Sequence, residues 1–311
     1  MIRVLVVVSA AFMSLSCGTG TIDPPSVVFD PDVVIPTDSR ADAGVTVTIA
    51  TWNVEDFGNQ SGTLAGTYMG VATVLDNASI DVAAFEEGQP EDIAPLSEAL
   101  SARGYSMPYL ACSSLSDGYN GLAVASKYAI SGAEEILPKA SGNWPRSLYK
   151  VKIDIGRGLT LFVCHLKSGS DAGALGQRRA QAQALAAYLR EVYASSLDSA
   201  SLVILGDMNT MSAGDRDGAP STLDFLESRD DADAANDFRS MTESLLSIEE
   251  AYTWEGSVSG TWTRSALDHI VLSPNAQIRY IPGSLEILRV DPSVAISANS
   301  DHYPVVLDIS L

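Results

Sequence analysis

The chain has 311 residues, of which 46% are hydrophobic and 19% charged, a composition typical of a globular protein rather than a disordered one. Its 19 basic residues against 39 acidic ones give a net charge of −20 at neutral pH. So acidic a chain is not expected to coat nucleic acid or an anionic membrane, because phosphate binding depends on local Lys and Arg that release counterions. Any chemistry on a phosphate must therefore rely on a few local cations or a bound metal.

The first residues are predicted to be a targeting segment that does not join the fold. Residues 4–15 form an apolar run too short to cross a bilayer as a helix, which takes about 20 residues. The run ends in Leu-Ser-Cys-Gly at 15–18, which resembles the bacterial lipoprotein signal. We therefore expect residues 1–16 to be a signal peptide and Cys17 to carry the lipid. An ordinary cleaved signal peptide of a secreted or periplasmic protein is the alternative.

Residues 17–44 are rich in Pro and Asp and predict an extended, solvated tether, so the folded domain is expected over 45–311. This organisation predicts an extracytoplasmic protein held on a bacterial membrane through its lipid anchor only. We expect a monomer, and nothing in the sequence identifies a protein partner.

The domain alternates short apolar strands with a few helical stretches. Period-two alternation or brief β-branched runs predict strands at 45–52, 82–85, 122–126, 149–155, 159–166, 202–205, 270–272 and 305–309. Helices are predicted at 66–78, 95–103, 176–193 and 222–227. Helices spaced this irregularly among strands indicate an α/β (α+β) fold, a four-layer αββα sandwich of two mixed β-sheets flanked by helices.

Six of the apolar runs are followed by Asn, Asp, Glu or His. These residues are Asn53, Glu87, His165, Asp207 with Asn209, Asp268 with His269, and Asp301 with His302. One such residue is ordinarily an Asx turn or the start of a loop. Six together, which use all three histidines, predict that the strand ends meet at one rim.

Carboxylates, amides and imidazoles gathered at one rim have a definite chemical use. Oxygen ligands without a cysteine cluster suit Mg²⁺, with Mn²⁺ or Ca²⁺ as alternatives. Histidines titrate near neutrality and exchange protons. A metal acting as Lewis acid beside such histidines and phosphate-binding amides describes phosphoester hydrolysis.

The motifs also resemble a known family, the endonuclease/exonuclease/phosphatase superfamily, also called deoxyribonuclease I-like, over about residues 45–311. The matching segments are Thr-Trp-Asn-Val-Glu-Asp-Phe-Gly at 51–58, Asp-Val-Ala-Ala-Phe-Glu-Glu at 81–87, His165, Gly-Asp-Met-Asn at 206–209, Leu-Asp-His at 267–269 and Ser-Asp-His at 300–302. Each segment alone is a weak signal, but the set in this order is specific.

The resemblance implies a metal site and a residue pair that activates water. Glu87, rather than its neighbour Glu86, would hold a divalent metal together with Asn53 and Asp301. His302, oriented by Asp268, would act as general base or as a cation on the phosphate, while Asp207 aligns the attacking water.

It also implies a phosphate-binding set formed by His165, Asn209 and Arg146, in which His165 could protonate the leaving oxygen. Asn120 stands where the secreted deoxyribonucleases have a Glu that partners this histidine, so His165 is expected to lack a carboxylate partner. Two other kinds of residue are expected outside the chemistry. His269 should point to the opposite face from Asp268 by strand alternation, and Arg178 and Arg179, near the start of a helix, are expected to face solvent.

The substrate is the least determined property, because one fold supports many reactions. We expect an extracytoplasmic endonuclease that cleaves DNA or RNA. A phospholipid or small-molecule phosphodiesterase or phosphatase, of the sphingomyelinase or inositol-phosphate type, is the alternative, and an inactive binding lipoprotein is a third. Residues 215–250 hold 11 acidic and 3 basic residues, which predicts either a solvated loop or a Ca²⁺ site formed by Asp230, Asp231, Asp233 and Asp237. A disulfide between Cys112 and Cys164 also stays open.

Overall fold

The structure, a computed structural model, describes residues 44–58, 64–114, 121–136, 146, 148–193, 196–197, 199–211, 213–216, 218, 220–227, 237–245, 247–258, 260–291, 296 and 300–311. The predicted signal peptide, Cys17, the predicted tether before Gly44, and Asn120 lie outside these residues. Across the described ranges, no helix combines the length and the apolar composition that crossing a membrane requires.

The first sheet has six strands in the order β13-β14-β1-β2-β4-β3. Their bounds are Glu286–Ile287, Val305–Ser310, Thr46–Asn53, Val82–Glu86, Leu122–Ser126 and Tyr109–Cys112. β1 runs parallel to β2 and antiparallel to β14, so the sheet is mixed.

The second sheet also has six strands, in the order β5-β6-β7-β8-β12-β9. They cover Ile130–Ile136, Leu148–Ile153, Leu159–His165, Leu202–Asp207, Asp268–Leu272 and Arg239–Ser240. β7 and β8 are parallel, and β12 is antiparallel to β8. A separate hairpin is formed by β10 (Trp254–Val258) and β11 (Thr261–Ser265).

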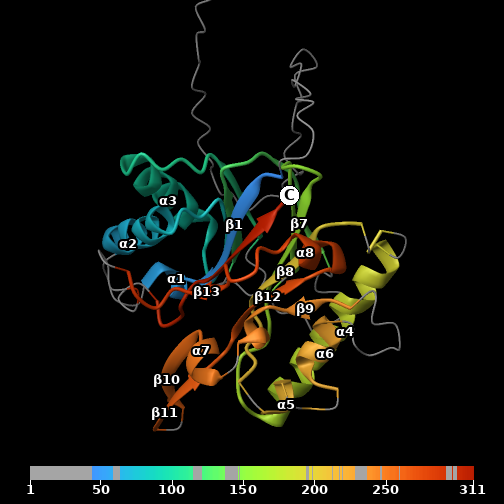
Figure 1. The fold of residues 1–311 in the computed structure, drawn as a ribbon. Coiled ribbons are helices and arrows are strands. Elements are labelled where there is room, and N and C mark those ends of the chain that lie inside the picture. The colour runs from blue at the N-terminus through green and yellow to red at the C-terminus, as the bar shows by residue number, and fades with distance from the viewer. Residues whose placement is uncertain are drawn as a thin grey trace, which may run out of the picture. The chain divides into compact units, whose positions relative to one another are not determined.

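Helices lie on the outer faces of both sheets (Figure 1). On the first sheet these are α2 (Leu64–Asn77) and α3 (Pro90–Ala102), and on the second α4 (Ala172–Tyr193) and α6 (Thr222–Leu226). Shorter helices lie in the connections, namely α1 (Glu55–Gly58), α5 (Ala213–Arg216), η4 (Thr242–Ser244), α7 (Ile248–Ala251) and α8 (Pro274–Arg279). The predicted four-layer αββα sandwich is confirmed.

The central strands are apolar on both faces because both faces are covered. In β7, Leu161 and Val163 join the core between the sheets, whereas Phe162 and Cys164 join the core under α4 and α6. This explains why the run from Leu159 to Cys164 reads as continuous hydrophobicity. Of the described cysteines, Cys112 and Cys164 are free thiols, so they form no disulfide with each other.

All eight predicted strands are present, but helix α3 begins five residues earlier than predicted. It starts at Pro90, where Gln89 and Asp92 form a capping box. Pro95, predicted as the start, instead lies inside the helix. The capping box and the proline in the first turn mark the start of the helix, and Pro95 removes one intrahelical hydrogen bond further along.

Candidate active site

Strand direction brings the polar strand ends to one rim. β1 and β2 are parallel and end side by side at Asn53 and Glu86, and β7 and β8 end side by side at His165 and Asp207. The antiparallel β12 begins at the same rim, where Asp268 lies opposite Asp207. The two sheets pack face to face through β1, β2, β7 and β8, so these ends face one another across the sandwich.

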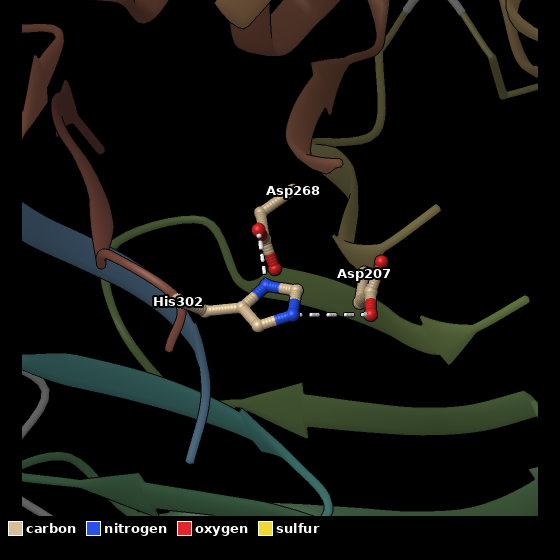
Figure 2. Close-up of side chains that lie close together, drawn as sticks. All are labelled: Asp207, Asp268 and His302. Carbon is tan, nitrogen blue, oxygen red and sulfur yellow. Dashed lines mark hydrogen bonds and ion pairs between the residues drawn. The ribbon is translucent and has the colours of Figure 1, made fainter. Parts of the chain in front are cut away.

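His302 lies between two carboxylates, as Figure 2 shows. Its Nδ1 donates a 2.8 Å hydrogen bond to Asp268 Oδ2, and its Nε2 lies 3.9 Å from Asp207 Oδ2. Asp268 is held in turn by the Thr253 hydroxyl, which donates to the same carboxylate at 2.6 Å. The imidazole is therefore fixed in one orientation, with Nε2 directed at Asp207.

Burial disfavours the charged form of His302, but the negative charge and hydrogen bond of Asp268, with further contributions from Asp207 and Asp301, outweigh it. Together they raise the pKa of His302 to about 10. Burial and the charge of Asp268 raise the pKa of Asp207 to about 7. The raised pKa of His302 favours its imidazolium form, and the raised pKa of Asp207 favours proton exchange near neutral pH.

Asn53 joins the two sheets at this rim. Its Nδ2 donates to Asp207 Oδ2 at 3.1 Å and to Glu87 Oε1 at 3.3 Å, and its Oδ1 accepts the Glu55 backbone N–H at 3.1 Å. The side chain thus sets the separation of the two carboxylates. Its role as a metal ligand stays a prediction.

Glu86 and Glu87 lie in different surroundings, although they are adjacent. Glu86 ends β2, is fully buried and accepts a 2.9 Å hydrogen bond from Thr51 Oγ1. Glu87 follows with φ of 60°, a left-handed conformation that turns its carboxylate into the site, where 24% of the side chain stays exposed. Burial raises the pKa of both carboxyls, and that of Glu86 by far the more. Only Glu87 is accessible to a cation.

His165 is buried at the end of β7. Its Nε2 lies 3.4 Å from Asp207 Oδ2 and 3.7 Å from Glu87 Oε1. Its Nδ1 has no hydrogen-bond partner among the residues that the structure describes. Burial, assisted by the charges of Arg146 and His302, lowers the pKa of His165 well below its usual value, so this imidazole is neutral.

The Gly-Asp-Met-Asn corner depends on its glycine. Gly206 has φ of +137°, and a Cβ there would lie 1.9 Å from the Cys164 carbonyl oxygen, so no other residue fits. Asn209 is itself left-handed, with φ of 51°. Its N–H donates to Asp207 Oδ1 at 2.8 Å, and its Nδ2 donates to the Leu166 carbonyl at 3.2 Å.

Arg146 and Asp301 lie at the edge of the cluster. Arg146 is half-buried and donates from Nη1 to the Leu166 carbonyl at 3.4 Å. Its charge partly offsets the burial that raises the pKa of Glu87, and it helps to lower the pKa of His165. Asp301 Oδ2 accepts a 2.8 Å hydrogen bond from Trp254 Nε1, and its Oδ1 lies 3.8 Å from His302 Nε2. The structure therefore brings all nine predicted site residues to one rim, and their individual roles stay predictions.

The donor set fits a hard divalent cation. Asp207, Asp268 and His302 each offer a ligand atom within 4.8 Å of the other two, but His302 Nδ1 and Asp268 Oδ2 are already hydrogen-bonded to each other. Glu87 and Asp301 have more accessible carboxylates, and their role as cation ligands stays a prediction. The raised pKa values of Glu87 and Asp207 show a site where a bound cation would relieve the cost of buried negative charge.

Arg178 differs from its prediction, and Thr253 was not predicted as part of the site. Arg178 was expected to face solvent but is fully buried, because Asp215 on α5 supplies a bidentate partner. Thr253 holds Asp268 and was not singled out, since a Thr before a Trp carries no distinctive pattern. His269 points away from the site, as expected, and contacts Thr210 Oγ1 at 2.9 Å and Ser240 Oγ at 3.2 Å.

The acidic segment is not one solvated loop. Asp215 is buried against Arg178, and Asp224 caps α6. Residues 228–236, which include Asp230, Asp231 and Asp233 of the suggested Ca²⁺ site, lie outside the described residues.

The chain matches one protein family and resembles several solved structures. A profile of the Endonuclease/Exonuclease/phosphatase family matches residues 50–302. No curated protein matches the sequence. Solved structures with a similar fold include TDP2 from Caenorhabditis elegans, at 18% identity over 86% of this chain and 75% of that one, with a TM-score of 0.62.

Two further structures contain DNA. D. rerio TDP2 complexed with single strand DNA product is 19% identical over 87% of this chain and 100% of that one, with a TM-score of 0.63. The 3′ phosphatase NExo from Neisseria, bound to a product DNA hairpin, is 17% identical over 85% and 100%, with a TM-score of 0.59. At these identities the likeness establishes the fold alone.

Proposed function

Because this chain belongs to the Endonuclease/Exonuclease/phosphatase family, whose members are metal-dependent phosphoric-ester hydrolases, we propose that it is a nuclease that cleaves phosphodiester bonds of DNA or RNA. The observation that carries the proposal is the arrangement of His302. It is bonded to Asp268 on one side and faces Asp207 on the other, within reach of the candidate phosphate-binding side chains.

Glu87 and Asp301 are the residues that would hold the cation, Mg²⁺ in our proposal. When bound, it supplies Lewis-acid stabilisation of the charge on the phosphate oxygens. Asn53 contributes by fixing Glu87 relative to Asp207 through its two hydrogen bonds.

Asp207 and His302 divide the handling of water and charge. With a pKa near 7, the Asp207 carboxylate orients the attacking water and takes up its proton. The raised pKa of His302 favours the imidazolium, so this residue acts as a cation on the phosphate rather than as the base. Asp268 maintains that charge and the direction of Nε2.

His165 and Asn209 serve the phosphate. The neutral His165 offers an N–H to a phosphate oxygen but is a poor proton source, since burial lowers its pKa. Asn209 has one Nδ2 hydrogen on the Leu166 carbonyl, which leaves the other to bind phosphate. Arg146 adds a second positive charge, beside that of His302, to a chain whose net charge is −20.

The nucleic-acid substrate is supported by two similar structures that hold DNA products. The test incubates purified protein and Mg²⁺ with plasmid DNA, RNA, sphingomyelin and inositol phosphates, with and without chelator. We expect cleavage of DNA or RNA that disappears with chelator and with His302→Ala. Turnover of the lipid or sugar substrates only would replace this proposal with the phospholipid or small-molecule alternative, and nicking that survives both treatments would contradict it.

We also propose that the enzyme works outside the cytoplasm as a lipoprotein, on the sequence around Cys17. Metabolic labelling with palmitate, followed by membrane fractionation, tests this. Cys17→Ser should remove the label and release the protein from membranes. Labelling that is unaffected by Cys17→Ser would contradict lipidation at this residue.

A further inference from the structure

We propose that Gln181 and Arg178, two buried side chains of α4, are positioning residues that set the phosphate-binding geometry through the backbone of residues 166–169. Both residues are fully buried although they are polar. They lie three positions apart, on one face of the helix, and that face covers the segment that follows His165. The inference rests on the proposed phosphoester-binding role of Asn209 and Arg146.

The peptide unit between Leu166 and Lys167 is held at both ends. Its N–H donates a 2.9 Å hydrogen bond to Gln181 Oε1. Its carbonyl accepts from Asn209 Nδ2 at 3.2 Å and from Arg146 Nη1 at 3.4 Å. In a planar trans peptide the N–H and C=O point in opposite directions, so fixing the N–H on α4 aims the carbonyl at the site.

The Leu166 carbonyl also sets the orientation of the Asn209 side-chain amide. Because a carbonyl oxygen can only accept, Asn209 must direct Nδ2 toward it, which keeps the second Nδ2 hydrogen available for a phosphate oxygen. The same oxygen fixes one end of the Arg146 guanidinium. One acceptor therefore orients both candidate phosphate ligands.

Arg178 fixes the next part of the same segment. Its Nη1 donates to the Lys167 carbonyl at 2.8 Å and to the Gly169 carbonyl at 2.7 Å. Its Nε and Nη2 bind the two oxygens of Asp215 at 2.8 and 2.7 Å. One guanidinium thus ties the segment after β7 to α5, which follows the Asn209 corner, so the supports of His165 and Asn209 cannot move independently.

The test uses the full chain with bis(p-nitrophenyl) phosphate as substrate and inorganic phosphate as inhibitor. Gln181→Leu removes the acceptor, and Gln183→Leu, an exposed position on the same helix, is the matched control. We expect Gln181→Leu to lower kcat/KM about tenfold and to weaken phosphate inhibition by a similar factor. Gln183→Leu should change neither, and Gln181→Glu, which keeps an acceptor, should restore most of both.

A double-mutant cycle separates positioning from general destabilisation. If Gln181 acts partly through Asn209, Gln181→Leu should have a smaller effect on phosphate inhibition in an Asn209→Ala background than in the wild type, with the remainder acting through Arg146. Equal effects in both backgrounds, or a Gln181→Leu enzyme that matches Gln183→Leu, would overturn the inference. If Gln181→Leu does not fold, Gln181→Met is measured in its place. A wild-type enzyme without turnover of any phosphodiester would instead contradict the proposed function.

Discussion

The candidate site consists of two halves that are held in different ways. The first-sheet half is Asn53, Glu87, Asp301 and His302, and its two accessible carboxylates, Glu87 and Asp301, are 24% and 46% exposed. The second-sheet half is His165, Asp207, Asn209 and Asp268, none of which is more than 4% exposed. The difference indicates a division of work, in which one half exchanges a cation with solvent and the other keeps a fixed geometry for the phosphate.

The largest effect on activity should come from the first-sheet half, which carries the accessible carboxylates. Glu87→Gln removes the charge that would hold the cation and should lower kcat about a thousandfold, equivalent to about 4 kcal/mol of transition-state stabilisation. Rates measured against Mg²⁺ concentration check this. A wild-type rate and metal dependence in Glu87→Gln would show that this carboxylate is not the cation ligand.

A substitution in the second-sheet half should cause a smaller loss of activity. Asn209→Ala removes one phosphate donor and should lower kcat about a hundredfold, with the Mg²⁺ dependence unchanged. Steady-state kinetics across Mg²⁺ concentrations measure both quantities. A shifted metal dependence would show that the two halves do not act separately.

The charge on His302 should make the metal-free protein less stable at high pH. Its folded pKa of about 10 lies above the usual 6.5, so its stabilisation is complete below pH 6.5 and is lost as the pH rises through 10. Between pH 7 and 9 the free energy of unfolding should fall by about 2 kcal/mol. Urea unfolding in chelator measures this. His302→Gln serves as the control and should remove most of this slope, and the same slope in both proteins would assign it to other groups.

The smallest effect is expected at the edge of the accessible half. Trp254→Phe removes the hydrogen bond to Asp301, which is partly exposed to solvent, and should change stability by about 0.5 kcal/mol and kcat no more than about threefold. Thermal unfolding and kinetics test this. A loss near that of Glu87→Gln would mean that Asp301 must be held in place to bind the cation.

The strands that are covered on both faces can be predicted from the sequence. The runs before His165 and Asp207 are apolar at nearly every position, with Thr160 the exception in β7, because both faces of these strands are covered. Such runs are recognisable without a structure. Six strands were not predicted, namely β3, β5, β9, β10, β11 and β13. β3, β9 and β13 have only four or two residues. β5 and β10 are partly exposed and carry Ser, Gly and Glu, which do not give a strand pattern, and β11 is mostly exposed.

The site residues were predictable from motifs, but their supports were not. Gly-Asp-Met-Asn marks Asp207 and Asn209 directly. Arg178 appears in the sequence as an ordinary helix cation, and its burial depends on Asp215, 37 residues further along the chain. Contacts of that separation leave no periodic signal, which is why the expectation for Arg178 was wrong.

The pairing of β1 with β14 also has a consequence for synthesis. Thr46 pairs with Ser310, and the Thr48 hydroxyl bonds to Asp308, 260 residues away. β1 has β2 as its other neighbour, so one edge of β1 stays open until β14 is made. His302 comes only just before β14 in the chain. A nascent polypeptide that stops before His302 therefore has neither a complete first sheet nor a complete site, and hydrolytic capacity requires synthesis through β14.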